Sequence, residues 1–220
     1  MNAFATTAPI TAVLHIPAGR VQLVATDSDD VTVEVKPANA AKSRDVKAAE
    51  QTTVSFADGV LNIDNPTKNQ YLGSTGSVEV TVALPTGSNV QAKTDATELR
   101  TSGHLGDVAY EGAYSQIKVE SAANLRLSAA DGDIEVGRVG GSSEITTARG
   151  DIRVAEAAGG SLVLRTQLGD ITVVAAAGVS AALDAGTSNG RINNSLKNDG
   201  GVELDIRATT TSGDITARSL

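Results

Sequence analysis

Gly132-Asp133-Ile134 is the first copy of a short phrase that recurs four more times before the chain ends. The other copies are Gly150-Asp151-Ile152, Gly169-Asp170-Ile171, Gly190-Arg191-Ile192 and Gly213-Asp214-Ile215. Successive phrase glycines are 18, 19, 21 and 23 residues apart, and self-similarity at a fixed period is the signature of a repeat architecture. The phrase therefore predicts an all-β fold, a β-solenoid (β-helix-like) with about 18–23 residues per coil.

Apolar residues keep a fixed place relative to each phrase. Because alternate side chains of a strand face one side, the inward set after the phrase is Ile134/Val136, Ile152/Val154, Ile171/Val173, Ile192/Asn194 and Ile215/Ala217. The opposite wall is supplied by Leu125/Leu127, Ile145, Leu162/Leu164, Leu183 and Leu204/Ile206. A second glycine position, at Gly140-Gly141, Gly159-Gly160, Gly178 and Gly200-Gly201, predicts a second corner. We expect two walls, two glycine corners and the same columns stacked coil upon coil.

Two polar columns accompany the phrase. Asp133, Asp151, Asp170 and Asp214 are predicted to stack at one corner, with Arg191 interrupting them. Their carboxylates are interpreted as acceptors of turn N–H groups. Calcium binding is the alternative, because hard cations take carboxylate oxygens, but a column strings its ligands along a line and we predict no metal site. Three residues before a phrase glycine stand Thr147, Thr166, Thr187 and Thr210, a ladder expected at a strand edge or corner.

The first part of the chain is less regular. Residues 1–95 are predicted to form a β-meander or sandwich-like region that could cap the solenoid of residues 96–220. Strands are expected at 10–16, 20–26 and 31–35, which together would form the meander. A hairpin is expected at 52–63, because Asp58-Gly59 supplies the positive φ of a tight turn. Residues 38–50 are predicted as a short helix or loop, 65–76 as a mobile loop and 77–84 as a strand.

Composition limits both the core and the partners. The 220 residues include 22 glycines, no tryptophan and only five aromatics, which indicates a narrow core of stacked aliphatic side chains. The net charge of −8, with no block of Lys and Arg, disfavours nucleic-acid binding. The absence of cysteine excludes disulfides and thiol catalysis. No export signal or 18-residue apolar run is visible, so the expected location is cytoplasmic, without direct membrane insertion.

No catalytic constellation stands out. His15 and His104 are the only histidines, and neither has a Ser, Cys or Asp partner at a recognisable spacing. Acid pairs such as Asp131/Asp133 or Glu111/Glu120 could serve a lyase or glycosidase. Sugar-processing β-helices usually present aromatic side chains to stack on rings, however, and Tyr110 and Tyr114 are thin support. We expect no enzyme, no catalytic residue and no cofactor.

A family resemblance rests on the stretch from Gly76 to Ser88, the Gly-Asp-Ile repeats, and the ending Thr210-Thr211-Ser212-Gly213-Asp214-Ile215-Thr216-Ala217-Arg218. These resemble the bacterial β-strand-repeat family labelled "putative adhesin", especially its actinobacterial members, over nearly the whole chain. The resemblance implies a β-solenoid-like fold with a less regular N-terminal β part. It implies no known activity and carries over no catalytic residue. The chain departs from the pattern at Arg191 and in the missing export signal.

Two functions of different classes follow. The first is a non-enzymatic structural or interaction protein, because the end strands of a solenoid expose unpaired backbone groups. The last phrase runs almost to Leu220, so the C-terminal coil is predicted to be open and to self-associate into a dimer or filament. The predicted assembly end consists of Val202, Leu204, Ile206 and Ile215. The alternative is a carbohydrate or cell-envelope polymer binding module, with a glycan or an unknown protein as its partner.

Overall fold

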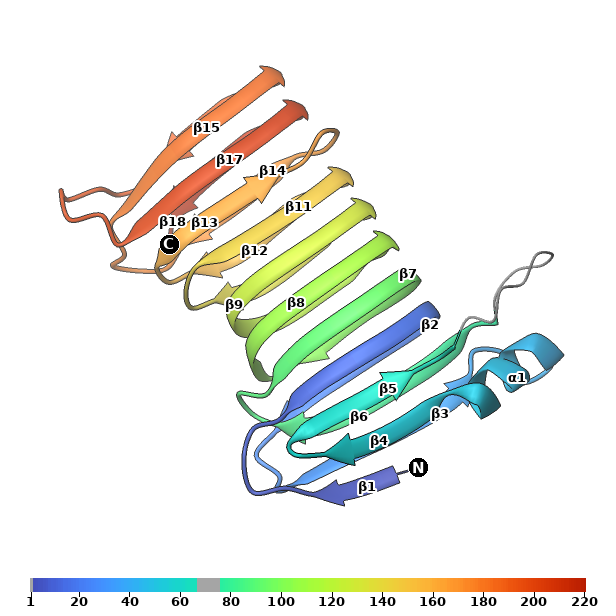
Figure 1. Ribbon diagram of the computed structural model, residues 1–220. Helices are drawn as coiled ribbons and strands as arrows, with labels where there is room; N and C mark the ends of the chain where they lie inside the picture. Colours follow the sequence, from blue (N-terminus) through green and yellow to red (C-terminus); the bar gives the residue numbers. More distant parts are fainter. Residues whose placement is uncertain (1, 67–75) are drawn as a thin grey trace. The chain divides into compact units, whose positions relative to one another are not determined.

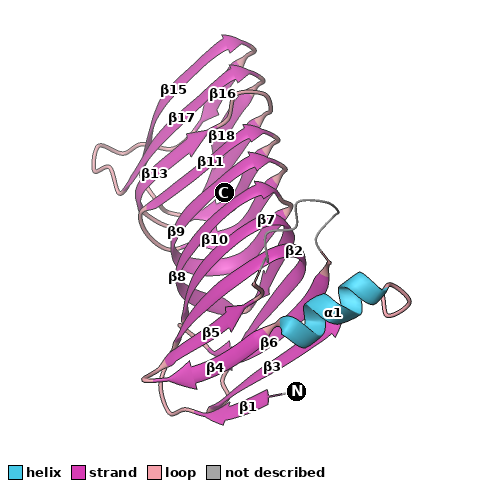
Figure 2. Ribbon diagram, turned by 45° about the vertical axis from the view of Figure 1, so that its right-hand side comes forward, coloured by secondary structure: helices cyan, strands magenta, loops and turns pink. Residues whose placement is uncertain are grey.

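The computed structural model describes residues 2–66 and 76–220, and over these residues the protein is all-β with one short helix (Figures 1 and 2). This confirms the predicted fold class at the level of all-β. The chain forms two compact units, Met1–Ser115 and Gln116–Leu220. The boundary expected near residue 95 falls inside a strand, Asn89–Ser102. Most of the loop predicted at 65–76 lies outside the described residues.

The first unit contains eight of the described strands and the helix. They are β1 (Asn2–Ala5), β2 (Thr11–Thr26), β3 (Asp30–Pro37), α1 (Ser43–Gln51), β4 (Thr53–Ala57), β5 (Val60–Asp64), β6 (Val78–Pro85), β7 (Asn89–Ser102) and β8 (His104–Tyr114).

Strand β2 is the centre of the first unit. Its first half pairs in parallel with β5 and β7, and its second half pairs in parallel with β6 and β7. Separate strands at 10–16 and 20–26 were expected, but the chain runs on through Gly19, whose φ is +136°. A Cβ at Gly19 would lie 1.8 Å from the Val78 carbonyl oxygen, so glycine lets β6 approach at the bend. β2 therefore belongs to two rows of strands, one that contains β5 and one that contains β6.

The meander prediction is wrong, because β6 lies between β2 and β3. It pairs in parallel with β2 and antiparallel with β3. Val78, Val80 and Val82 of β6 are all essentially buried. An alternating apolar strand from later in the chain thus fills the place next to β2, and burial of that strand decides the pairing.

The hairpin and the helix agree with the sequence-based expectations. β4 and β5 pair antiparallel around Asp58 and Gly59, whose φ angles are +51° and +74°. α1 falls in the segment expected to be a helix or loop and packs against β3 and β6. Its buried Asp45 carboxylate accepts the Ser77 N–H at 3.1 Å, which ties the helix to the start of β6.

The second unit contains the remaining ten strands. They are β9 (Ile117–Asp131), β10 (Ile134–Val139), β11 (Ser143–Arg149), β12 (Ile152–Ala157), β13 (Gly160–Arg165), β14 (Ile171–Ala175), β15 (Ala181–Asn189), β16 (Ile192–Ser195), β17 (Leu204–Ser212) and β18 (Ile215–Ser219).

These strands form two rows in parallel register. The phrase row begins with the first half of β9 and continues through β10, β12, β14, β18 and β16. The return row begins with the second half of β9 and continues through β11, β13, β17 and β15. In each row the inward residues stack on one another, as Ile134 does on Ile152 and Ile145 on Leu164. All four of these side chains are fully buried.

The order in which the repeats stack in space differs from their order in the sequence. β17 pairs with both β13 and β15, and β18 pairs with both β14 and β16. The C-terminal repeat is therefore inserted between residues 160–175 and residues 181–195. The prediction that the C-terminal coil forms the open end is wrong.

The predicted assembly residues are placed accordingly. Leu204, Ile206 and Ile215 are 0% exposed in the middle of the stack, and of the four only Val202 is exposed, at 50%. The amino-acid composition of the two repeats explains this order. The inward residues of β17 and β18 are all apolar (Leu204, Ile206, Ala208, Ile215 and Ala217), whereas β16 has an asparagine, Asn194, at the position paired with Ala217. Covering the more apolar repeat on both sides removes more apolar surface from water.

Candidate interaction edge

The phrase glycines allow neighbouring repeats to approach closely. Gly132, Gly150, Gly169 and Gly213 have φ angles between +133° and +151°. A Cβ at Gly213 would lie 2.0 Å from the Gly169 carbonyl oxygen, and one at Gly169 would lie 2.1 Å from that of Gly150. Because only glycine tolerates both the positive φ and the close backbone, these four glycines set the corners of their repeats. Gly190 has no positive φ, but a Cβ there would lie 1.9 Å from the Gly213 carbonyl oxygen.

The phrase aspartates form an unbroken column along this corner. The backbone N–H of the second phrase residue donates to the aspartate carboxylate of the adjacent repeat in the stack. The pairs are Asp151 to Asp133 (2.8 Å), Asp170 to Asp151 (2.9 Å), Asp214 to Asp170 (2.8 Å) and Arg191 to Asp214 (2.8 Å). Arg191 thus ends the column, and the prediction that it interrupts the column is wrong. In the described part of the chain, no group of three His, Cys, Asp or Glu residues could hold a metal ion.

The threonine ladder forms hydrogen bonds to the backbone of the same corner. Each hydroxyl donates to a phrase-glycine carbonyl of the neighbouring repeat: Thr147 to Gly132 (3.3 Å), Thr166 to Gly150 (3.1 Å), Thr210 to Gly169 (3.1 Å) and Thr187 to Gly213 (3.0 Å). The spacing in the sequence locates these threonines, whereas the spatial order of the repeats decides their partners.

The second unit ends in two strands that are paired on one side only. Among the described residues, the only strand paired with β15 is β17 and the only strand paired with β16 is β18. On the other side of β15, the first residue is already engaged, because the Ala181 N–H donates to the Lys197 carbonyl at 2.9 Å. We call β15 and β16 the open edge; Figure 1 shows β15 as the outermost strand of the return row in this unit. Natural edge strands are usually short or guarded by lysine or proline. β15 has nine residues and contains neither of these residue types. The segment at Lys197 covers only its first residue, Ala181.

The core is partly uncovered at the open edge. Ile215 of β18 is fully buried, while Ile192, at the same phrase position on β16, is 44% exposed. Leu183 of β15 is half-buried, although its register partner Ile206 is fully buried. The inward columns that run through the unit therefore reach solvent at this edge.

Opposite charges flank the two ends of β15. Arg191 follows its C-terminal end, with a side chain 84% exposed and 3.4 Å from Asp214. At the N-terminal end, Ser180 Oγ accepts the Asp199 N–H at 3.2 Å, and the Ser180 N–H donates to Glu203 at 3.3 Å. The hydrogen bond with the Ser180 side chain, followed by that from the Gly201 N–H, lowers the pKa of Asp199. Asp199 is therefore ionised at neutral pH.

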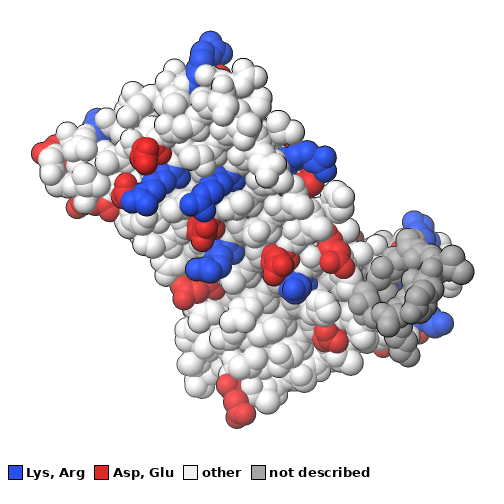
Figure 3. All heavy atoms as spheres, turned by 45° about the horizontal axis from the view of Figure 1, so that its top comes forward, with Lys and Arg blue, Asp and Glu red and all other residues white. Residues whose placement is uncertain are grey.

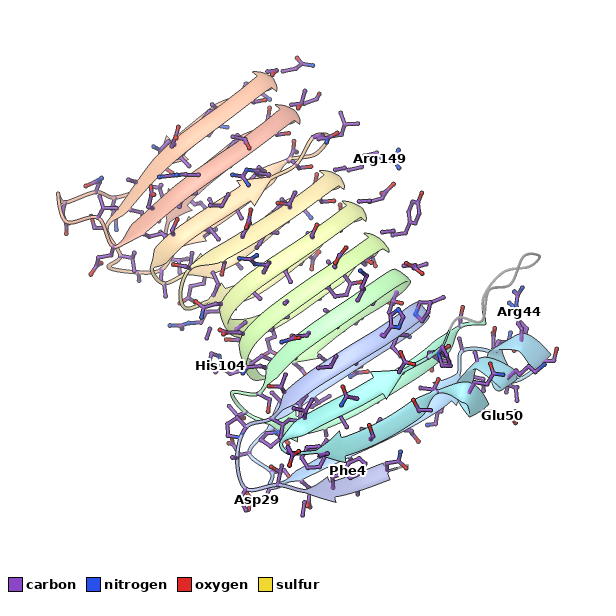
Figure 4. The ribbon with its side chains drawn as sticks, viewed as in Figure 1. Phe4, Asp29, Arg44, Glu50, His104 and Arg149 are labelled. Atoms are coloured by element: carbon purple, nitrogen blue, oxygen red, sulfur yellow. The ribbon has the colours of Figure 1, made fainter. Side chains whose placement is uncertain are left out.

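The remaining candidates from the sequence lie elsewhere. His15 Nδ1 is 3.0 Å from Asp64 Oδ1 on the neighbouring strand, and both side chains are about half exposed. His104 begins β8 (Figure 4). Asp131 pairs with Arg149 at 2.8 Å, and Glu111 with Lys93 at 3.7 Å. These acids are engaged in ordinary ion pairs between strands.

Tyr110 is a buried structural residue, and its use as a sugar platform is excluded by its 3% exposure. Its hydroxyl lies 2.7 Å from both Thr94 Oγ1 and Ser115 Oγ and donates to the Thr97 carbonyl at 3.0 Å. Burial raises the pKa of Tyr110. The alternation of Val108 and Tyr110 on β8 marks Tyr110 as inward, but its hydroxyl partners Thr94, Thr97 and Ser115 lie outside β8, and the sequence does not show that they meet it.

Acidic and basic side chains are interleaved on the surface. On the face shown in Figure 3 no large area of one sign is visible. Neighbouring strands of the second unit are linked by Lys118–Glu135 and Arg138–Glu156, both at 3.1 Å, and by Arg165–Glu144 at 3.0 Å. In the described residues, no helix has the length and apolar character needed to cross a membrane.

Comparison with known proteins gives the family and the fold. A "putative adhesin" from Bacteroides fragilis has a similar structure, with a TM-score of 0.56, 14% identity, and coverage of 98% of this chain and 95% of that chain. A "putative lipid binding protein" from Parabacteroides distasonis is 15% identical, with a TM-score of 0.45 and coverage of 98% and 95%. No curated protein matches the chain. The model of the Toastrack DUF4097 family matches residues 15–219, and the chain belongs to this family.

Proposed function

We propose that this protein is a non-enzymatic β-solenoid scaffold that self-associates through the open edge. The observation that carries this proposal is the pairing of β15 and β16 on one side only, at the place where Ile192 is 44% exposed. The solenoid assignment is supported by the in-register parallel pairing of successive repeats in both rows. The corner hydrogen bonds of the aspartates and threonines link the same repeats.

Two physical terms favour association at this edge. A strand added to β15 would satisfy backbone groups that now face water, and each such hydrogen bond is worth about 1 kcal/mol net. A repeat stacked on the edge would also cover Ile192 and Leu183, with a gain of about 25 cal/mol for each Å² of apolar surface removed from water. Both terms act in the free chain without any ligand.

The test is the mass in solution over a wide concentration range, by light scattering and sedimentation velocity. We expect the mass to rise with concentration and the Ile192→Lys variant to stay monomeric, because the lysine places a charge at the uncovered end of the core. Asn193→Lys is the matched control. It adds the same charge one residue along the strand, on the outer face, and should associate like the parent chain. A parent chain that stays monomeric at every concentration would contradict the proposal.

Binding of a carbohydrate or cell-envelope polymer is a second candidate. It is favoured by a row of polar side chains in register on three neighbouring strands, Thr172, Thr216 and Asn193. The name "putative adhesin" of the structural relative from Bacteroides fragilis is compatible with such a role. A glycan array and pull-down with purified cell-wall polymer should then show binding that Thr216→Ala weakens, and binding unchanged by Thr216→Ala would count against this row.

A further inference from the structure

We infer that the open edge joins two copies of this chain around a two-fold axis, with the two β15 strands antiparallel, so that a closed dimer forms instead of a filament. This inference rests on the proposed self-association. It specifies the partner and the symmetry of the same edge.

A filament would require a second, different surface that accepts β15. In the first unit, the two rows that include β2 end in β1 and β4. These strands have four and five residues, and short edge strands resist pairing with another chain. The rings of Phe4 and Phe56 are 5.4 Å apart and link the two strands, and Figure 4 labels Phe4 on β1. The first unit thus lacks an outer strand as long as β15 at these ends.

The charges at the open edge complement themselves under a two-fold rotation. Arg191 lies beyond the C-terminal end of β15, and Asp199 lies beside its N-terminal end through the hydrogen bond to Ser180. Nine residues of strand separate these ends by roughly 30 Å. A two-fold axis through the middle of β15 reverses the strand of the partner copy. Each Arg191 then faces the Asp199 of the partner, while like charges remain far apart.

The apolar residues also fit a self-complementary edge. The side chains of β15 that are buried or half-buried include Ala181, Leu183 and Ala185, which are small or medium in size. β16, which carries Ile192, contacts β15. An identical edge supplies the same set in reverse order. Stacking the two edges would continue the core from one copy into the other and cover Ile192 on both sides.

Single cysteines test the symmetry directly, because the chain has none of its own. Ala182→Cys, Asp184→Cys, Gly186→Cys and Ser188→Cys place one thiol each on the outer face of β15. A disulfide requires Cα atoms within about 7 Å, so only positions near the two-fold axis can react with their own copies. We expect rapid disulfide-linked dimers for one or two adjacent positions near the middle of the strand, and none at the two outermost positions. Thr209→Cys, on the neighbouring strand β17, is the matched control and should not cross-link.

A charge reversal gives an independent readout. Arg191→Glu should raise the dimer dissociation constant about tenfold, since two exposed ion pairs become repulsive. The double variant Arg191→Glu with Asp199→Arg should restore dimerisation, because the reversed charges face each other again. Failure of the double variant to recover would overturn the two-fold arrangement.

The outcomes separate the two proposals. If the parent chain stays monomeric by light scattering, the proposed self-association fails, and the two-fold arrangement fails with it. If the chain associates but no β15 cysteine cross-links, or if the mass grows beyond that of a dimer, only the two-fold arrangement is overturned.

Discussion

The repeats β17–β18 and β15–β16 lie next to each other and share the glycine and the isoleucine of the phrase, yet the isoleucine of one is buried and that of the other is partly exposed. Ile215 and Ile192 occupy equivalent, paired positions, with exposures of 0% and 44%. The β17–β18 repeat is covered on both sides, by β13–β14 and by β15–β16. The difference shows that a residue's energetic role in this unit depends on its place in the stack and not on its place in the chain.

The two repeats also differ in what their exposed groups can do: one stabilises the fold and the other can bind a partner. A covered repeat satisfies its backbone groups within the unit, so its apolar residues stabilise the fold. An outermost repeat leaves one side of each strand for a partner. Changes to interior groups should therefore have larger effects on stability than changes at the open edge.

Removal of the interior repeat should have the largest effect. A chain that ends at Lys197 lacks β17 and β18, which are the strand partners of β15 and β16. We expect the amides of β15 and β16 to lose protection in hydrogen exchange, while those of β11 and β12 keep it as an internal control. Retained protection of β15 would mean that it pairs directly with β13, and the inserted order would then not be essential.

The paired isoleucines should differ strongly in their contribution to stability. Ile215→Ala removes a fully buried side chain and should lower the free energy of unfolding by about 2–5 kcal/mol. Ile192→Ala should cost about 0.5–1 kcal/mol, because the side chain is already partly in water. Urea denaturation at a concentration where the chain is monomeric measures both values. Equal losses would contradict the difference in burial.

A glycine pair should show the next largest contrast. Gly213→Ala forces a Cβ to within 2.0 Å of the Gly169 carbonyl at a φ of +150°, and should cost about 1–3 kcal/mol. Gly186 on β15 has no positive φ, and nothing lies within 4 Å of its Cβ position. Gly186→Ala should be neutral or stabilise by up to about 1 kcal/mol. Thermal denaturation of the two variants would rank them.

The smallest effect concerns the charge at the open edge. The Ser180 side chain is the main cause of the lowered pKa of Asp199, so Ser180→Ala should raise that pKa toward its ordinary value of 3.8. The stabilising contribution of Asp199 is present above its unfolded-state pKa and is lost as pH falls through the lower, folded-state pKa. An NMR titration of the Asp199 carboxyl measures the shift, with Ser188→Ala as the control. An unchanged pKa in Ser180→Ala would contradict the assigned cause.

Much of the second unit could be predicted from local pattern. Periodicity locates the phrase glycines, the inward Ile and Leu columns and the threonine ladder, because each repeat makes the same turn at the corner and fills the same narrow core. The hairpin at Asp58-Gly59 was equally visible, since a tight turn needs positive φ at those positions. In the first unit the pairing of β6 between β2 and β3 was not predictable, because it joins segments that are far apart in the sequence.

The sequence by itself determined the all-β class, the length of the repeat and the residues that form its corners. Only the tertiary structure decided which repeat is the last of the second unit, and therefore that Ile192, and not Ile215, reaches solvent. Repeats with one shared register can stack in more than one order with the same local hydrogen bonds. The choice depends on the summed burial of whole repeats, which no single stretch of the sequence expresses.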